Sequence, residues 1–147
     1  MDVKNFMNDD LEFIEALVAE LNSNITKWPS DKVLERVNDM IHAFNKRFAF
    51  EDLLFCHIKT TTSMQKELKY FLAIRTSFRQ SLERILMLDV DEPDFRAEIA
   101  LLLEAVSKQL KYLRAEFDPR FTDQIAPEAM SELSGFLERK LRLIAFA

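Results

Sequence analysis

The chain contains almost no glycine and a single cysteine, and each shortage excludes classes of protein. Among its 147 residues there is one glycine, Gly135, and there are four prolines. Because tight β-turns and phosphate-binding loops depend on glycine, β-sandwiches, Walker loops and Rossmann loops are excluded. A lone cysteine, Cys56, cannot form an internal disulfide, which is typical of a reducing compartment. We therefore expect a cytoplasmic protein.

Long apolar runs and positive charge are also scarce. The longest apolar stretches fall far short of the roughly 18 residues that a membrane span needs, so we expect none. Twenty Lys and Arg against 25 Asp and Glu give a net charge of −5, which argues against a nucleic-acid-binding protein. Acids gather in residues 1–20 and bases in residues 58–80. Such local excess indicates either a solvated helix face or a surface that docks a partner.

Apolar residues recur every three or four positions in five segments, which predicts an all-α fold. The expected helices cover approximately residues 10–21, 31–58, 63–88, 93–118 and 127–146. Asp9 is expected to cap the first helix, Pro93 to open the fourth and Pro119 to end it.

Four helices joined by short connections pack best as an up-down-up-down antiparallel four-helix bundle. We expect a single domain over residues 1–147, with the bundle at about 8–121. An additional C-terminal helix at about 127–146 would cover one end or side of it. A three-plus-two arrangement of the helices is the alternative.

Charged residues interrupt the apolar stripes where these would face the centre of the bundle. The stripe of the second helix passes through Arg47 and Glu51, that of the third through Arg75, and that of the fourth reaches Glu116. Facing inward, these side chains would form a buried cluster, which costs several kcal/mol per ion unless the charges are well paired. Alternatively, they extend to the rim of the bundle. These four residues form the candidate ligand site.

Histidine is scarce, which bears on metal chemistry. Only His42 and His57 are present, and neither belongs to a Glu-x-x-His or His-x-x-x-His pattern, the spacings that put two metal ligands on one helix face. The sequence therefore predicts no metal site and no cofactor. Nothing supplies an activated nucleophile either, so we do not expect an enzyme.

Three segments resemble the hemerythrin-like family of four-helix bundles. The segment Arg-Phe-Ala-Phe-Glu-Asp-Leu-Leu at 47–54 is similar to the second-helix signature of that family, in which a His-Phe pair precedes two acids and an apolar pair. Residues 10–14 resemble the first-helix Asp-His-x-x-Ile motif, and residues 112–119 resemble the last-helix segment that carries a ligand carboxylate and ends in proline. The similarity covers about residues 8–121.

The departures from the family pattern decide what the resemblance implies. Where the family has iron-binding histidines, this chain has other residues: Leu11, Arg47, Phe71, Arg75, and Lys111 or Tyr112. Glu51 and Glu116 stand at the positions of the bridging carboxylates. Carboxylates without imidazoles make a poor iron site. The resemblance thus implies a hemerythrin-like scaffold that has lost its metal and oxygen chemistry.

Together these features favour a non-enzymatic, metal-free helical bundle that serves as a protein-interaction or regulatory module. A protein partner or a homodimer is expected. Residues 47–52 also resemble a stretch of bacterial regulators that sequester the sigma factor of RNA polymerase, which favours a protein partner. The alternative is a residual metal- or small-anion-binding site made of the inward carboxylates and arginines.

Overall fold

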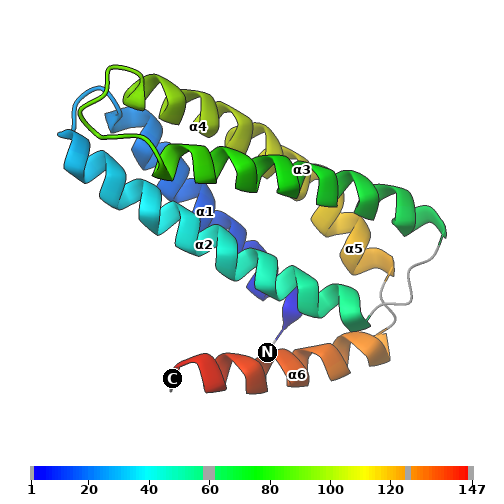
Figure 1. The fold of residues 1–147 in the computed structure, drawn as a ribbon. Coiled ribbons are helices and arrows are strands. Elements are labelled where there is room, and N and C mark those ends of the chain that lie inside the picture. Colours follow the sequence, from blue (N-terminus) through cyan, green and yellow to red (C-terminus); the bar gives the residue numbers. More distant parts are fainter. Residues whose placement is uncertain (1, 58–61, 125–126, 146–147) are drawn as a thin grey trace.

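The computed structural model describes residues 2–57, 62–124 and 127–145, and every regular element in these ranges is helical. The elements are α1 (Val3–Asn24), α2 (Ser30–His57), α3 (Thr62–Leu86), α4 (Phe95–Tyr112), the π-helical turn η1 (Leu113–Phe117), α5 (Asp118–Gln124) and α6 (Pro127–Ala145). Antiparallel contacts join α1 to α2, α1 to α4 and α3 to α4 (Figure 1). The prediction of an all-α antiparallel bundle with an additional C-terminal helix is confirmed.

The first helix begins earlier than predicted, and the fourth begins later. Asp2 caps α1, because its Oδ1 accepts the backbone N–H groups of Lys4 at 2.9 Å and Asn5 at 3.4 Å. Asp9 therefore lies inside the helix, and its predicted role as the cap is wrong. Pro93 precedes α4, which starts at Phe95. Both differences concern helix ends, where local signals such as Asp and Pro recur within a few residues.

The predicted stop at Pro119 is also wrong, because helical structure continues to Gln124. The N–H of Asp118 donates to the carbonyl of Leu113, five residues back, which closes the π-helical turn η1. Pro119 then stands second in α5, in the first turn of a new α-helical segment, where its missing N–H costs little. The last predicted residue of the second helix, Ile58, and that of the C-terminal helix, Phe146, lie outside the described residues.

Large aromatic side chains bridge α2 and α3. The ring centroid of Phe78 on α3 lies 4.6 Å from that of Phe44 and 6.0 Å from that of Phe48, both on α2. All three side chains are buried. Aromatic pairs at such distances stabilise the seam beyond their burial alone.

The helix α6 packs against α1 and α2 on the side of the bundle where α1 begins and α2 ends (Figure 1). It buries Leu133 and Leu137, four residues apart on one helix face. Among the described residues, no helix combines the length and the apolar character needed to cross a bilayer.

Candidate functional site

A buried arginine on α2, Arg47, joins three elements at the centre of the bundle. Its Nε donates to Glu51 Oε1 at 2.8 Å, one helical turn along α2. Its Nη2 donates to Asp118 Oδ1 at 2.7 Å, and its Nη1 donates to the backbone carbonyl of Met7 at 3.2 Å. Asp10 Oδ2 lies 3.8 Å from Nη1. The guanidinium group therefore links α2 to α1 and to α5.

The three acids around Arg47 differ from exposed carboxylates in their pKa values. Burial raises the pKa of Glu51 to about 7, although the charge of Arg47 opposes the shift. Burial likewise raises the pKa values of Asp10 and Asp118, again against the charge of Arg47. Burial alone would lower the pKa of Arg47, but the charges of Asp118 and Glu51 raise it instead. Arg47 is thus permanently charged, whereas its neighbours bind protons more readily than usual.

Glu116 does not belong to this cluster, so its predicted inward position is wrong. Its side chain is exposed, whereas Leu113 and Phe117 on either side are buried. Leu113 and Phe117 are four residues apart and share the inward face, and Glu116 lies to the side of that face. Asp118, which follows the turn, supplies the carboxylate that contacts Arg47.

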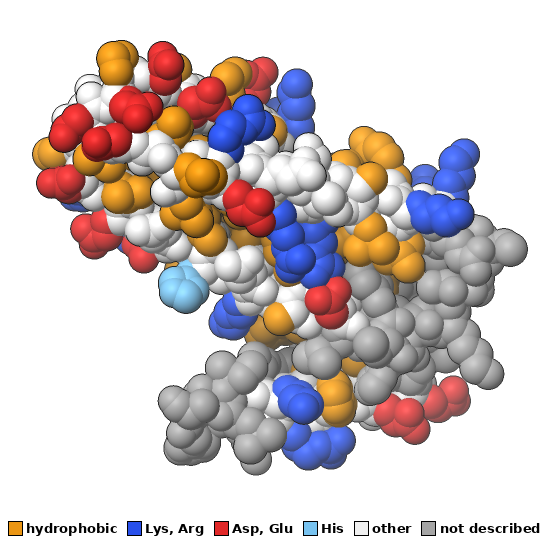
Figure 2. All heavy atoms as spheres, viewed as in Figure 1, with side chains coloured by type: hydrophobic (Ala, Val, Ile, Leu, Met, Phe, Trp, Pro, Cys, Tyr) orange, Lys and Arg blue, Asp and Glu red, His pale blue; other side chains and the backbone are white. Residues whose placement is uncertain are grey.

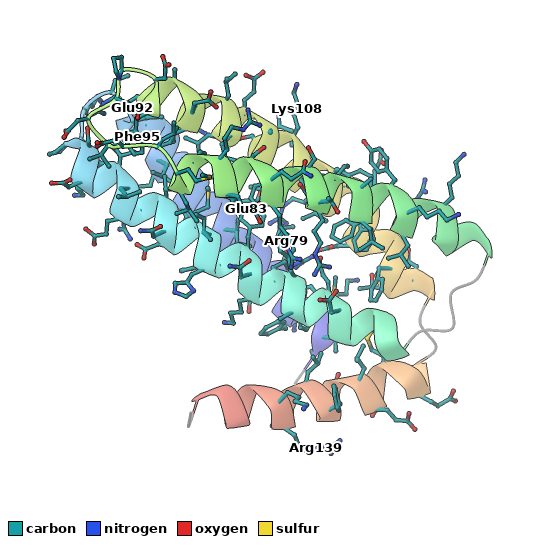
Figure 3. The ribbon with its side chains drawn as sticks, viewed as in Figure 1. Arg79, Glu83, Glu92, Phe95, Lys108 and Arg139 are labelled. Carbon is teal, nitrogen blue, oxygen red and sulfur yellow. The ribbon has the colours of Figure 1, made fainter. Side chains whose placement is uncertain are left out.

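Arg75 is buried as predicted, but it pairs with a different acid. Its Nη1 and Nη2 donate to the two carboxylate oxygens of Asp52 at 2.8 and 2.9 Å. This bidentate bond lowers the pKa of Asp52, against a smaller opposing effect of burial. The guanidinium also lies 4.7 Å from the ring centroid of Phe48, and that of Arg79, on the side of α3 facing α2, lies 5.3 Å from it (Figure 3).

The structure thus brings Arg47 and Glu51 together, places Arg75 in a neighbouring pair and adds two acids that the sequence analysis missed. A signal for Asp10 was available. The apolar stripe of α1 continues from Ile14 through Leu11 to Met7, and Asp10 lies directly beside this stripe. For Asp118 no periodic signal exists, because the π-helical turn is not visible in the sequence.

Nothing in the described part of the chain assembles a metal centre: no group of three or more His, Cys, Asp or Glu side chains there is placed to hold a metal ion. Two positions where the family resemblance would put iron ligands, Leu11 and Phe71, are buried in the apolar core. The side chains of Cys56 and His57 are not among those that the structure describes. The carboxylates of the cluster instead contact Arg47.

A cleft of about 360 Å³ lies next to the cluster, between α1 and α5. Asp118 forms part of its wall, together with two cationic side chains, Lys4 and Arg114. Arg114 is already engaged, because its Nε donates to Glu15 Oε1 at 3.0 Å and its Nη1 to Asn8 Oδ1 at 3.0 Å.

Comparison with known protein families, with curated proteins and with solved structures finds no match for this chain. The class of protein that the fold defines is an all-helical bundle of about five helices, and no family is identified.

Proposed function

We propose that this protein is a non-enzymatic, metal-free interaction module of the cytoplasm, built on a hemerythrin-like scaffold. The metal-free part of the proposal is supported by Arg47. Its guanidinium group contacts acids and a carbonyl from three elements. In the family pattern a histidine of the second helix stands at this position, and here a permanently charged group takes its place.

The interaction surface is an acidic end of the bundle, which is the observation that carries the proposal. Arg96 at the start of α4 donates to the carbonyl of Trp28 at 2.8 Å, which ties the beginning of α4 to the α1–α2 connection. Acidic side chains gather over this end (Figure 2). The exposed ones that define the acidic end are Asp31, Glu35, Asp89, Asp91, Glu92 and Asp94.

These acids differ from Glu15 and Glu20 of α1 in forming no ion pair within the described residues, although Asp89 Oδ1 accepts the backbone N–H of Asp91 at 3.1 Å. In α1, Glu15 is paired with Arg114 and Glu20 with Arg36, so much of the acidic excess predicted for the first helix is used internally. Within the described residues, by contrast, none of the acids of the acidic end forms an ion pair. Unpaired like charges repel one another, and a cationic partner would relieve this repulsion.

Two apolar side chains stand beside the acids. Leu86 is 56% exposed and Met87 is 87% exposed, at the point where α3 ends. Figure 3 shows Glu92 and Phe95 at the same end of the bundle. A flexible methionine adapts to varied apolar surfaces. Charge and apolar character together favour one kind of partner: a segment of another protein that is basic and amphipathic.

The test compares two charge-reversed triple variants of the full chain. Asp89→Lys/Asp91→Lys/Glu92→Lys reverses the acidic end, and Asp9→Lys/Glu12→Lys/Glu116→Lys makes the same charge change at exposed sites elsewhere. Proteins bound from an extract of the source cells are identified, and the purified partner is titrated at two salt concentrations. We expect binding through a basic segment, weakened by salt, lost in the first variant and kept in the second. Equal binding by both variants, or no specific partner at all, would refute the proposal.

The metal-free part has its own test. The purified protein is exposed to ferrous iron without oxygen, and its metal content and optical spectrum are measured. We expect no retained iron and a featureless spectrum. Stoichiometric iron with charge-transfer absorption would overturn this part.

A small-anion site is the second candidate function, favoured by Lys4 in the wall of the cleft between α1 and α5. Calorimetric titration with inorganic phosphate tests it. Binding by the wild type that is lost in Lys4→Met would support the site, and no heat of binding would exclude phosphate as its ligand.

A further inference from the structure

The cluster around Arg47 holds more negative than positive groups. Three carboxylates approach this one guanidinium, and the next cation, Arg75, is occupied by Asp52. Two carboxylate oxygens, Asp10 Oδ2 and Glu51 Oε2, are buried without a hydrogen-bond partner. A buried anionic oxygen that receives no hydrogen bond is costly, so the fully ionised cluster is incompletely compensated.

Glu51 is the group least able to keep its charge. Its side chain is fully buried, whereas those of Asp10 and Asp118 are 9% and 14% exposed. Each of the three acids is also influenced by a second cation, Arg75 for Glu51, Arg114 for Asp118 and Lys46 for Asp10, so the difference between them is burial.

Charged groups from several helices surround Glu51. The charged groups that act on it are Arg47 on α2, Arg75 on α3 and Asp118 on α5, and Asp10 on α1 meets the same guanidinium. From α6, which packs on α1 and α2, the buried side chains are the apolar Leu133 and Leu137. The described surroundings thus offer no free cation to Glu51 Oε2.

We propose that the folded protein binds a proton on Oε2 of Glu51, and that release of this proton near neutral pH weakens the junction between α1, α2 and α5. The proton comes from solvent and returns to it, and no other bond changes. With the proton bound, Glu51 Oε1 still accepts from Arg47 Nε, and Arg47 remains paired with Asp118. Without it, a further negative charge faces Asp118 and Asp10 across one guanidinium.

The pKa shift of Glu51 agrees with this geometry and sets the pH range. Burial raises the pKa of Glu51 from 4.5 to about 7 in the folded protein. Because the folded state then binds the proton more tightly than the unfolded state, the extra stability is complete below about pH 4.5 and is lost as pH rises through about 7. Asp10 and Asp118, whose pKa values are also raised, act in the same direction.

The experiment measures urea unfolding from pH 5.5 to pH 8 for the wild type, Glu51→Gln and Glu116→Gln. From a shift of 4.5 to about 7, the unfolding equilibrium constant of the wild type should rise about 30-fold over this range. Glu51→Gln mimics the protonated acid and should lose most of this dependence. The matched control Glu116→Gln removes an exposed carboxylate and should keep it, and both histidines are present in all three proteins.

A second measurement needs no variant to fold. Infrared spectra of the wild type should contain the band of a buried protonated carboxyl group at pH 5.5 and lose it by pH 9. Absence of such a band at pH 5.5 would overturn the proposal, as would a pH dependence in Glu51→Gln as steep as that of the wild type.

Discussion

Replacing Arg47 with methionine should destabilise the protein strongly, because the substitution keeps an unbranched apolar stem and removes the guanidinium group with its charge and its donors. Three hydrogen bonds disappear, to Glu51, Asp118 and the carbonyl of Met7. The carboxylate of Glu51 and the carbonyl of Met7 are then left in sites that water does not readily reach. Breaking a buried ion pair from one side typically costs about 3–5 kcal/mol, and we expect a loss in the free energy of unfolding of this size at pH 8.

The cost should depend on the charge state of the acids left behind. At pH 5.5 Glu51 is largely protonated, since its pKa is raised to about 7, so Arg47→Met should then cost less than at pH 8. The double variant Arg47→Met/Glu51→Gln should recover part of the loss at pH 8, because it removes one of the three carboxylates that Arg47 compensates. Urea unfolding followed by far-UV circular dichroism measures all of these values.

The matched control is Arg36→Met on the same helix. Arg36 pairs with Glu20 at 3.1 Å and Asp39 at 3.2 Å, but its side chain is 36% exposed. Exposed ion pairs contribute about 0–1 kcal/mol, so this variant should change stability only slightly. A loss for Arg47→Met as small as that for Arg36→Met would show that the buried cluster does not hold the bundle together, and would refute the reasoning.

Two further predictions concern the core. Phe78→Ala should cost about 3–5 kcal/mol in the free energy of unfolding, because it leaves a cavity between α2 and α3, where the ring centroid lies 4.6 Å from that of Phe44. The control is Tyr70→Ala, at a residue that is 57% exposed. Similar losses for both variants would contradict the role assigned to the aromatic contacts between α2 and α3. Gln109→Met should leave stability unchanged or raise it by up to about 1 kcal/mol, because Nε2 of Gln109 is buried without a hydrogen-bond partner. A clear loss of stability in the same urea assay would mean that this amide is satisfied in solution.

Local pattern was sufficient where the helix stayed regular. Arg47, Glu51 and Arg75 lie on apolar stripes of uninterrupted α-helices, and all three are buried as the spacing of 3.6 residues per turn requires. Glu116 and Asp118 show where this reasoning stops. Glu116 lies beside the face shared by Leu113 and Phe117, and the π-helical turn over these residues inserts one residue, so the apolar stripe of α4 does not predict the position of Asp118 after it.

Partner choice across helices was not predictable by the same means. Arg75 pairs with Asp52 because the two residues lie at the same level along α3 and α2. Asp10 reaches Arg47 because α1 lies antiparallel beside α2. Neither pair is close in the sequence. A periodic stripe states which face of a helix is buried, but not which residue of another helix stands opposite.

Composition and apolar periodicity are properties of the chain itself, and they were enough to specify an all-helical bundle and to place Arg47, Glu51 and Arg75 on its inward stripes. Near absence of glycine excluded turn-rich folds, and the 3–4 spacing of apolar residues set the inward faces. Packing decided the rest: which acids surround Arg47, where the helix changes its pitch after α4, and which acids at the acidic end form no ion pair. These features depend on distances between segments that are remote in the sequence, and only the tertiary structure brings those segments together.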